Sequence, residues 1–239
     1  MIFKKPKQIQ FVSTIKGLDS IEECLPKPAK YFVPKWFKDI PNSIPTTVKI
    51  CPSFPDYFSQ GYILPMWCDS KIQFDGTNWR WETSMDKFSW DHHGNQQFLN
   101  HTKASFNGVK GQFIFKAMCP WKMITPPGWS ILQLPLFYHF NQEWSVLPGI
   151  IDTDIYHNLN QQILYHGNGK EVTIKKGEPF VLYIPFKRSN KLELNIKYQT
   201  EDDIKKFEIE NLLINNSFHP NGSYRTMQRK RDKIRGHND

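Results

Sequence analysis

The feature that most constrains the fold is a stretch over residues 127–188, in which short apolar runs alternate with turn residues at nearly regular intervals. Pro148-Gly149, Gly167-Asn168-Gly169 and Lys176-Gly177-Glu178-Pro179 separate several of these runs. Strand-length runs with turn signals at this spacing are typical of antiparallel sandwiches and barrels. The stretch predicts a mainly β fold, a jelly-roll or cupin-like β-sandwich or barrel. The predicted strands are residues 131–140, 149–156, 161–166, 171–174 and 180–186.

The rest of the chain suggests an arm before this core and a tail after it. Six prolines in residues 1–45 exclude a long helix or central strand and predict an extended N-terminal arm, with one helical turn near residues 35–39. Residues 46–198 are the predicted core. It contains a strand, short helix and strand over residues 48–69, further strands in 71–83 and 109–117, and a hairpin at Asp75-Gly76. Residues 89–110 are polar and predict an exposed loop.

Residues 199–239 are predicted to be a helix followed by a basic tail. Before them, residues 192–197 alternate as a strand would. Residues 200–215 have Thr200 as a candidate N-cap and Asp203 three residues later, which resembles a capping box. The incomplete apolar stripe of this helix predicts packing against the barrel.

Composition excludes several protein classes. The 239 residues suffice for one large β domain, and 15% aromatic residues supply a core. No run reaches the roughly 20 apolar residues of a membrane helix, and the first residues lack the apolar block of a signal peptide, so we expect no membrane contact and synthesis in a cytoplasm. The cysteines do not form a CxxC pair, which predicts reduced structural thiols. They are Cys24, Cys51, Cys68 and Cys119.

A metal site has little support from spacing. The chain lacks the His-x-His pattern of a cupin, and the adjacent His92 and His93 would point to opposite sides of a strand. Asp152 and Asp154 share one face of a predicted strand near His157, so these three are the metal ligands if there are any. The more ordinary interpretation is a polar strand end whose carboxylates accept backbone N–H groups. We expect no cofactor.

Aromatic side chains offer a second kind of site. Trp79, Trp81 and Trp90 are candidates for stacking on sugar rings, although large aromatics at strand spacing more often belong to a core.

The basic C-terminal tail offers a third kind of candidate site. The net charge of +8 is concentrated partly near the C-terminus, but no stacking platform or nucleic-acid motif accompanies it, so contact with other protein subunits, including copies of this chain, is favoured over nucleic acid. The candidate interaction residues are Arg225, Arg229, Lys230, Arg231, Lys233 and Arg235.

The chain resembles an uncharacterised family of tailed-phage proteins, notably from T4-like phages of marine bacteria and cyanobacteria, with bacterial relatives. The resemblance lies in VPKWF, VKICPSFPDYFSQGYILPMWCD, PPGWSILQLPLFYHF, LPGIIDTDIYH and KKGEPFVLYIPFKR, which run from about residue 33 to residue 188. The family has no established activity, so the resemblance implies a phage context, with synthesis in the host cytoplasm and a place in the virion if the protein is structural, and it assigns no catalytic residue.

Taken together, these patterns favour a non-enzymatic structural or interaction protein of phage type, associated with the virion and contacting neighbouring subunits through its terminal arms. The alternative is a cupin-like Fe(II)-dependent oxygenase or a carbohydrate-binding or carbohydrate-modifying accessory protein. The two are separated by whether the β core holds a metal or is filled by side chains.

Overall fold

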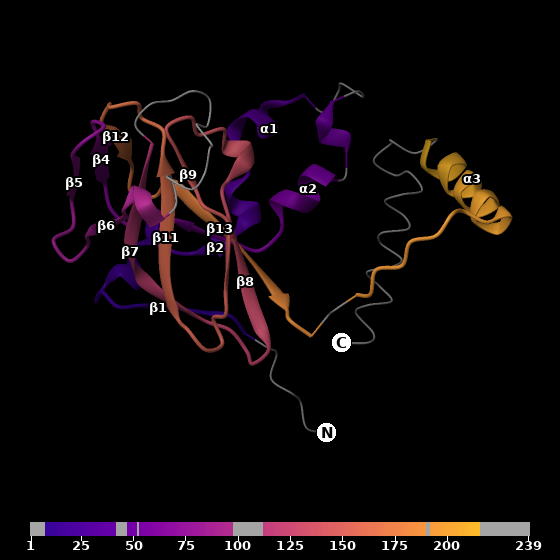
Figure 1. Cartoon of the computed structure of the whole chain (residues 1–239), viewed down its shortest axis with the longest axis horizontal. Coiled ribbons are helices and arrows are strands. Elements are labelled where there is room, and N and C mark those ends of the chain that lie inside the picture. Colours follow the sequence, from indigo (N-terminus) through magenta and orange to yellow (C-terminus); the bar gives the residue numbers. More distant parts are fainter. Residues whose placement is uncertain (1–7, 42–46, 52, 98–111, 190–191, 216–239) are drawn as a thin grey trace. The chain divides into compact units, whose positions relative to one another are not determined.

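The structure, a computed structural model, describes residues 8–41, 47–51, 53–97, 112–189 and 192–215 (Figure 1). The chain divides into two compact units. Unit 1 comprises Met1–Phe32 and Gln60–Asn190, and unit 2 comprises Val33–Ser59 and Lys191–Asp239. All the paired strands described lie in unit 1.

Sheet A of unit 1 has the strand order β1-β7-β11-β9, and β6 also pairs with β7. Its longest strand is β7, whose 12 residues pair antiparallel with β1 near one end and with β6 near the other. The strand β9 lies at the opposite edge of the sheet. The strands are β1 (Gln10–Ser13), β6 (Trp90–His93), β7 (Phe113–Ile124), β9 (Trp144–Val146) and β11 (Asn158–Tyr165).

Sheet B has the order β10-β8-β13-β3-β2, and sheet C the order β12-β4-β5. Residues 180–183 of the central strand β13 are buried without interruption, because both faces of this strand are covered. Sheet B contains β2 (Lys27–Pro28), β3 (Tyr62–Pro65), β8 (Trp129–Leu134), β10 (Gly149–Ile151) and β13 (Pro179–Lys187). Sheet C contains β4 (Ser70–Phe74), β5 (Trp79–Thr83) and β12 (Val172–Ile174).

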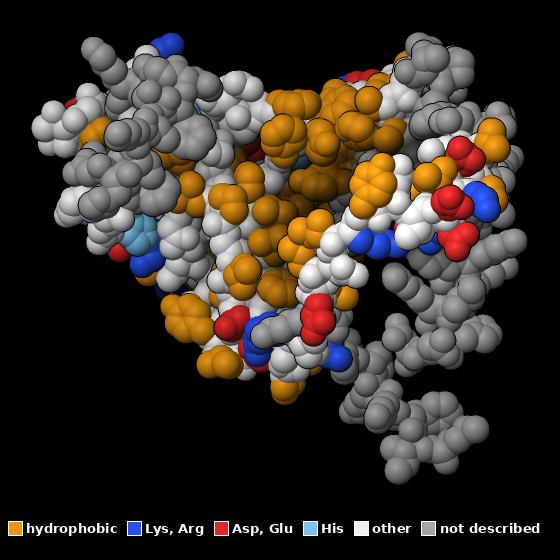
Figure 2. All heavy atoms as spheres, turned by 45° about the vertical axis from the view of Figure 1, so that its right-hand side comes forward, with side chains coloured by type: hydrophobic (Ala, Val, Ile, Leu, Met, Phe, Trp, Pro, Cys, Tyr) orange, Lys and Arg blue, Asp and Glu red, His pale blue; other side chains and the backbone are white. Residues whose placement is uncertain are grey.

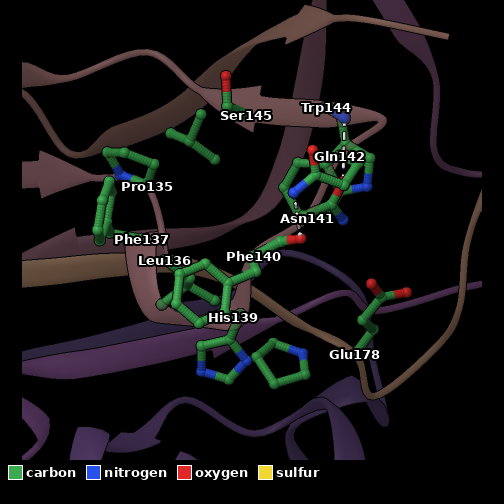
Figure 3. A pocket seen from close by; sticks show the side chains of 12 residues that line it. Pro135, Leu136, Phe137, His139, Phe140, Asn141, Gln142, Trp144, Ser145 and Glu178 are labelled. Atoms are coloured by element: carbon green, nitrogen blue, oxygen red, sulfur yellow. Dashed lines mark hydrogen bonds between the residues drawn. The ribbon is translucent and has the colours of Figure 1, made fainter. Parts of the chain in front are cut away.

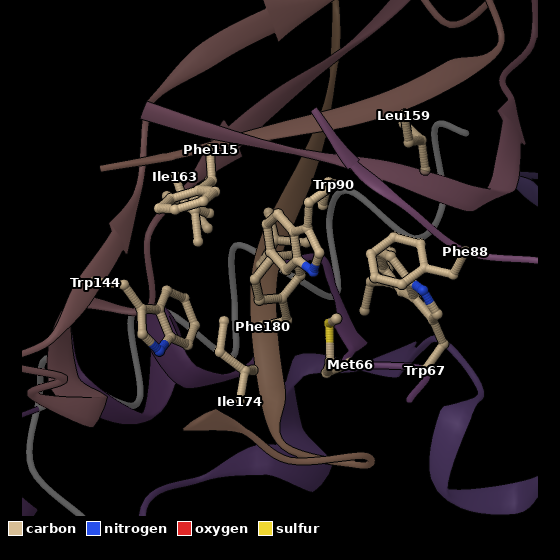
Figure 4. Packing of buried hydrophobic residues seen from close by; sticks show 14 of the residues in the cluster. Met66, Trp67, Phe88, Trp90, Phe115, Trp144, Leu159, Ile163, Ile174 and Phe180 are labelled. Atoms are coloured by element: carbon tan, nitrogen blue, oxygen red, sulfur yellow. The ribbon is translucent and has the colours of Figure 1, made fainter. Parts of the chain in front are cut away.

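A single cluster of buried side chains joins the three sheets. Phe180 of β13 is fully buried within it, and the rings of Trp67, Trp90 and Trp144 lie 5.2–6.4 Å from the Phe180 ring (Figure 4). The Trp67 and Trp90 rings meet the Phe180 ring edge to face, and such pairs add to the stabilisation that area burial provides. Aromatic side chains therefore fill the described core.

Short 3-10 helices connect the strands of unit 1. They are η1 (Leu18–Ser20), η2 (Glu22–Cys24), η3 (Ala29–Phe32), η5 (Asn95–Gln97) and η8 (Phe137–His139).

Unit 2 contains the helices α1 (Lys35–Asp39), α2 (Ser53–Phe58) and α3 (Glu201–Asn215) and the 3-10 helix η4 (Val48–Ile50). Phe37 packs against Phe54 and Phe58, with ring centroids 6.0 and 4.9 Å apart, which joins α1 to α2. In α3, Thr200 Oγ1 accepts the Asp203 N–H, and the Asp203 carboxylate accepts the Thr200 N–H. This reciprocal pair confirms the predicted capping box.

The mainly β prediction with a C-terminal helix is confirmed, since the described strands form several antiparallel sheets. The helical turn at residues 35–39 and the hairpin at Asp75-Gly76 are also confirmed. In that hairpin, Asp75 Oδ1 accepts the N–H groups of Thr77 and Asn78, and Gly76 supplies a positive φ of 103°. The turn therefore follows from local chemistry.

Several predicted boundaries were wrong. The strand expected over residues 131–140 ends at Leu134, because Pro135 interrupts it, and the strand expected over 149–156 ends at Ile151 in a turn. Val48–Ile50 forms a 3-10 helix where we expected a strand. Within the polar stretch 89–110, Trp90–His93 is a strand paired with β7, and residues 98–111 lie outside the described residues. Residues 192–197 alternate as predicted but pair with no described strand.

Candidate functional site

The predicted acidic cluster lies in the turn between β10 and β11, and Arg188 reaches it from the end of β13. The Arg188 Nη1 lies 3.2 Å from Asp152 Oδ1 and 2.8 Å from Asp154 Oδ1, and Nη2 lies 2.5 Å from Asp154 Oδ2. Ser130 Oγ donates to Asp152 Oδ1, and the Gly128 N–H donates to Asp154 Oδ2. The cluster is thus a charge-assisted network that joins three segments of the chain.

The Arg188 side chain alters the protonation of its partner. Its hydrogen bonds to Asp154 favour the carboxylate form and lower the pKa of Asp154 to about 2. The same pairing raises the pKa of Arg188. Both groups are charged at neutral pH, so the network already has a cation for its carboxylates.

His157 does not join the two carboxylates at a common centre. Its Nδ1 lies 2.9 Å from the carbonyl oxygen of Thr153. Among the described residues, no group of three or more His, Cys, Asp or Glu side chains is arranged to hold a metal ion. The backbone N–H accepted by Asp154 matches the structural interpretation of this segment as a polar strand end.

The tryptophans proposed for sugar stacking are in different environments. Trp90 is 3% exposed and belongs to the core, so its ring is not available to a ligand. Trp79 and Trp81 of β5 are partly buried against the core, and the Trp79 ring lies 4.5 Å from the His92 ring. These positions favour packing roles for the three indoles. The basic tail residues proposed for interaction lie outside the described residues.

A pocket of about 360 Å³ is lined by the residues of β9, an edge strand of sheet A, and by neighbouring segments (Figure 3). We call it the aromatic pocket. Both ends of the segment that joins β8 to β9 contribute to it, together with the first residue of β13. Its lining residues are Pro135, Leu136, Phe137, His139, Phe140, Asn141, Gln142, Trp144, Ser145, Val146, Glu178 and Pro179. Phe137 and Phe140 are 67% and 52% exposed, although both are large and apolar.

The rim of the aromatic pocket is shaped by an unusual backbone. Phe140 has a φ of 53°, which a residue with a side chain adopts only at a cost of order 1–3 kcal/mol. Asn141 Oδ1 accepts the N–H groups of Glu143 and Trp144, so the turn that follows is closed by a side chain. Strained backbone held in this way is more common at binding sites than elsewhere.

Histidines near this pocket are kept neutral. Burial lowers the pKa of His139, which lines the pocket, although a backbone hydrogen bond to Phe32 opposes the shift. Burial also lowers the pKa of His166, whose Nε2 lies 3.1 Å from Ser145 Oγ. The pocket wall is therefore largely uncharged at neutral pH, apart from Glu178.

A second hollow, of about 400 Å³, has a different chemistry, and we call it the amide groove. Strands of sheets A and B both line it. Its lining residues are His93, Lys116, Gln133, Gly149, Ile150, Ile151, Asp152, Tyr156, Asn158, Asn160 and Gln162. Gln133 is 2% exposed, and its Oε1 is buried with no hydrogen-bond partner among the described residues. A buried carbonyl left unpaired costs about 1–3 kcal/mol.

Apolar side chains also lie exposed outside the two hollows. Hydrophobic side chains gather in patches on the face drawn in Figure 2. In unit 2, the segment Leu192, Leu194, Ile196 and Tyr198 is 83–96% exposed at every one of these alternate positions. We call residues 192–198 the C-terminal arm. In α3, four further apolar residues are exposed by 39–66%, namely Ile204, Phe207, Ile209 and Leu212.

Sequence reasoning missed both hollows. Pro135 within the run 131–140 was the available signal that this segment leaves the sheet and contributes to a rim. For the amide groove, the alternation of Asn158, Asn160 and Gln162 in a strand indicated a polar face, but nothing local indicated that Gln133 lies beside it.

Comparisons with known proteins assign no family to this chain. No model of a known family matches this chain, and no curated protein matches it in sequence. Among solved structures, the chain is similar to the native dUTPase of EIAV, with 12% identity and a TM-score of 0.32 over 59% of this chain and 86% of that one. This similarity assigns no activity to the chain. No helix among the described residues combines the length and apolar character needed to cross a membrane.

Proposed function

We propose that this chain is a non-enzymatic interaction protein of a phage particle that contacts neighbouring copies through its C-terminal arm. The observation that carries the proposal is the alternation in LELNIKY, where every second side chain is apolar and at least 83% exposed. One apolar face and one polar face are the pattern of a half-buried strand. A strand of this kind gains its stability from a sheet edge that accepts it.

The acceptor we propose is the edge strand β9 with the aromatic pocket beside it. Within the described sheet, β9 has a neighbour only on its β11 side, so a strand can add at its other edge, where it would replace Asn141 Oδ1 as the acceptor of the Trp144 N–H. Trp144, Ser145 and Val146 of β9 all line the pocket. An added strand would hydrogen-bond to β9 while its alternate apolar side chains fill the pocket.

The acceptor we propose lies on a second copy of the chain, and the mixing experiment below separates this arrangement from a contact within one chain.

The finer fold assignment belongs to the same proposal. We propose that sheets A and B are the two layers of a jelly-roll-like sandwich, which is supported by the antiparallel pairing throughout and by the shared aromatic core. A sandwich that exchanges an arm with its neighbour forms assemblies without a large flat interface. This suits a virion component, the context that the resemblance implies.

The test compares two charge-matched double variants by analytical ultracentrifugation at about 100 μM, where contacts with a Kd of micromolar strength are populated. Leu194→Asp/Ile196→Asp puts two carboxylates on the apolar face of the arm, and Asn195→Asp/Gln199→Asp puts two on the polar face. The wild-type chain and the polar-face variant should associate, and the apolar-face variant should be monomeric. A monomeric wild-type chain contradicts the proposal.

Mixing distinguishes exchange between copies from contacts within one chain. Phe140→Gly relieves the positive φ and removes a pocket wall, so it should abolish association and leave folding intact. A mixture of the Phe140→Gly and Leu194→Asp/Ile196→Asp variants has one intact pocket and one intact arm, and it should form mixed dimers. If the arm acts within its own chain, mixing restores nothing.

A separate measurement tests whether the chain is a component of the virion. Quantitative mass spectrometry of purified virions from the source should find this chain at a copy number in fixed ratio to a shell protein. Absence from the virion contradicts the virion assignment and leaves the arm contact to be judged by the sedimentation experiment alone.

A further inference from the structure

Amide side chains from two sheets converge on the amide groove. Asn158, Asn160 and Gln162 recur at every second position of β11, so their side chains lie on the same face of sheet A. Gln162 is directly opposite Lys116 of β7. Gln133 contributes from β8 of sheet B. The groove has the volume of a small-molecule site, of which a few hundred cubic ångströms is typical.

These amides have unused hydrogen-bonding capacity. Gln133 Nε2 donates to the Leu147 carbonyl, while its Oε1 has no partner among the described residues. Asn158 Oδ1 accepts from Lys122, which leaves the Asn158 NH₂ group as a donor. The side chains of Asn160 and Gln162 make no hydrogen bond to a described residue. Each amide offers one acceptor and two donor hydrogens.

The rim adds apolar surface to these polar groups. Ile150 is 65% exposed and Tyr156 is 52% exposed, and both line the groove. Gly149, which is opposite Gln133, leaves open space where a side chain would be, since a Cβ added there meets no atom within 4 Å. A ligand therefore meets amide donors and acceptors together with an aliphatic and an aromatic side chain.

The charges of the groove disfavour an anionic ligand. The Lys116 ammonium lies 4.0 Å from Asp91 Oδ2, and Asp152 adds a carboxylate to the wall. The His93 Nδ1 is 2.7 Å from Gln97 Oε1. A phosphate binds best to several unpaired cations or backbone N–H groups, and this lining does not supply them. Neutral groups that both donate and accept hydrogen bonds match it better.

We propose that the amide groove is a binding site for a neutral carbohydrate. Each sugar hydroxyl both donates and accepts a hydrogen bond, as each amide does, and the half-buried amides of Asn160 and Gln162 are the groups it would meet in the groove. The C–H face of a pyranose ring would pack against Ile150 and Tyr156. This site is separate from the Trp79, Trp81 and Trp90 candidates, and it does not depend on the arm contact.

The experiment titrates the full chain with maltohexaose, cellohexaose and chitohexaose, followed by calorimetry and saturation-transfer NMR. We expect at least one of the three to bind with a Kd of about 1 mM or below. Asn160→Ala/Gln162→Ala should weaken that binding at least about tenfold, because it removes two unpaired amides from the surface. Gly149→Leu should weaken it similarly by filling the groove.

The matched control is Gln199→Ala, which removes an exposed amide elsewhere in the chain and should leave the affinity unchanged. Thermal unfolding verifies that each variant is folded, and if Gly149→Leu does not fold, the surface double variant decides. The proposal is overturned if none of the three saccharides binds at about 20 mM, or if the groove variants bind as tightly as the wild-type chain. The monomeric arm variant should still bind sugar, so the two proposals fail independently.

Discussion

Arg188 and Asp154, 34 residues apart in sequence, form a two-bond ion pair, with Nη1 2.8 Å from Oδ1 and Nη2 2.5 Å from Oδ2. Arg188 Nη1 also donates to the Trp129 carbonyl at the start of β8. The guanidinium therefore joins the end of β13, the start of β8 and the turn after β10. The planar fork of arginine matches a carboxylate in a way that lysine cannot.

This pair predicts a specific acid sensitivity. Pairing lowers the pKa of Asp154 from 3.8 to about 2, so the folded carboxylate holds its proton less tightly than the unfolded one. The contribution to the free energy of unfolding is thus fully present above about pH 4 and is lost as the pH falls towards 2. Urea unfolding at several pH values should show Asp154→Asn less stable than wild type at pH 7, with the difference shrinking below pH 4.

The matched variant for this measurement is Arg188→Lys, which keeps the positive charge and removes the fork. It should retain part of the pH dependence, because a cation remains near the carboxylate, and lose part of the stability. A stability difference between wild type and Asp154→Asn that stays constant from pH 7 to pH 2 would show that ionisation of Asp154 does not stabilise the fold.

The sequence predicts elements well where the signal is local. The Asp75-Gly76 hairpin, the Thr200–Asp203 capping box and the strands near residues 172–174 and 180–186 each depend on residues close together in the chain. Boundaries fail where an apolar run continues past a turn. Residues 131–140 look like one strand, but the chain leaves the sheet after Leu134 and continues as a 3-10 helix.

The candidate sites were not predictable in the same way, because they are formed by contacts between distant residues. Asp152 and Asp154 suggested a cation, but no local feature identified that cation as Arg188. The strand spacing of Trp90 favoured a core position without excluding a surface one, and the pairing of β6 with β7 places its ring inside. Similarly, the amide groove exists because β8 lies near β11.

Two glycines with different surroundings provide a paired prediction about packing. Gly61 has a φ of 68°, and a Cβ there would collide with the carbonyl oxygen of Tyr183. Gly61→Ala should therefore lower the free energy of unfolding by about 3 kcal/mol, from left-handed strain and overpacking together. Gly149→Ala meets open space and should change it by less than about 0.5 kcal/mol. Chemical denaturation measures both, and equal losses would contradict the close approach of residue 61 to β13.

The indole of Trp79 is expected to stabilise the fold. Its ring lies 4.5 Å from the His92 ring and 6.1 Å from the Phe113 ring, while the adjacent Arg80 is exposed. Trp79→Ala should cost about 2–3 kcal/mol of stability, less than a fully buried tryptophan would. Arg80→Ala should cost less than about 0.5 kcal/mol. If the Trp79→Ala protein is as stable as wild type, the Trp79 ring does not stabilise the fold and is a candidate for a binding role.

Thiol reactivity gives the last prediction. All four cysteines are free, and burial raises the pKa of Cys68 to about 11 and that of Cys119 to about 12. The thiolate is the reactive form, so at pH 8 only about one molecule in a thousand would carry a Cys68 thiolate, and fewer a Cys119 thiolate. Iodoacetamide labelling read by peptide mass spectrometry should be at least about 100-fold slower at both positions in the native protein than in urea, and it should accelerate as the pH rises. Equal rates in the native and unfolded protein at Cys119 would show that its Sγ is open to solvent, and that the hydrogen bond it accepts from the Trp121 N–H does not persist.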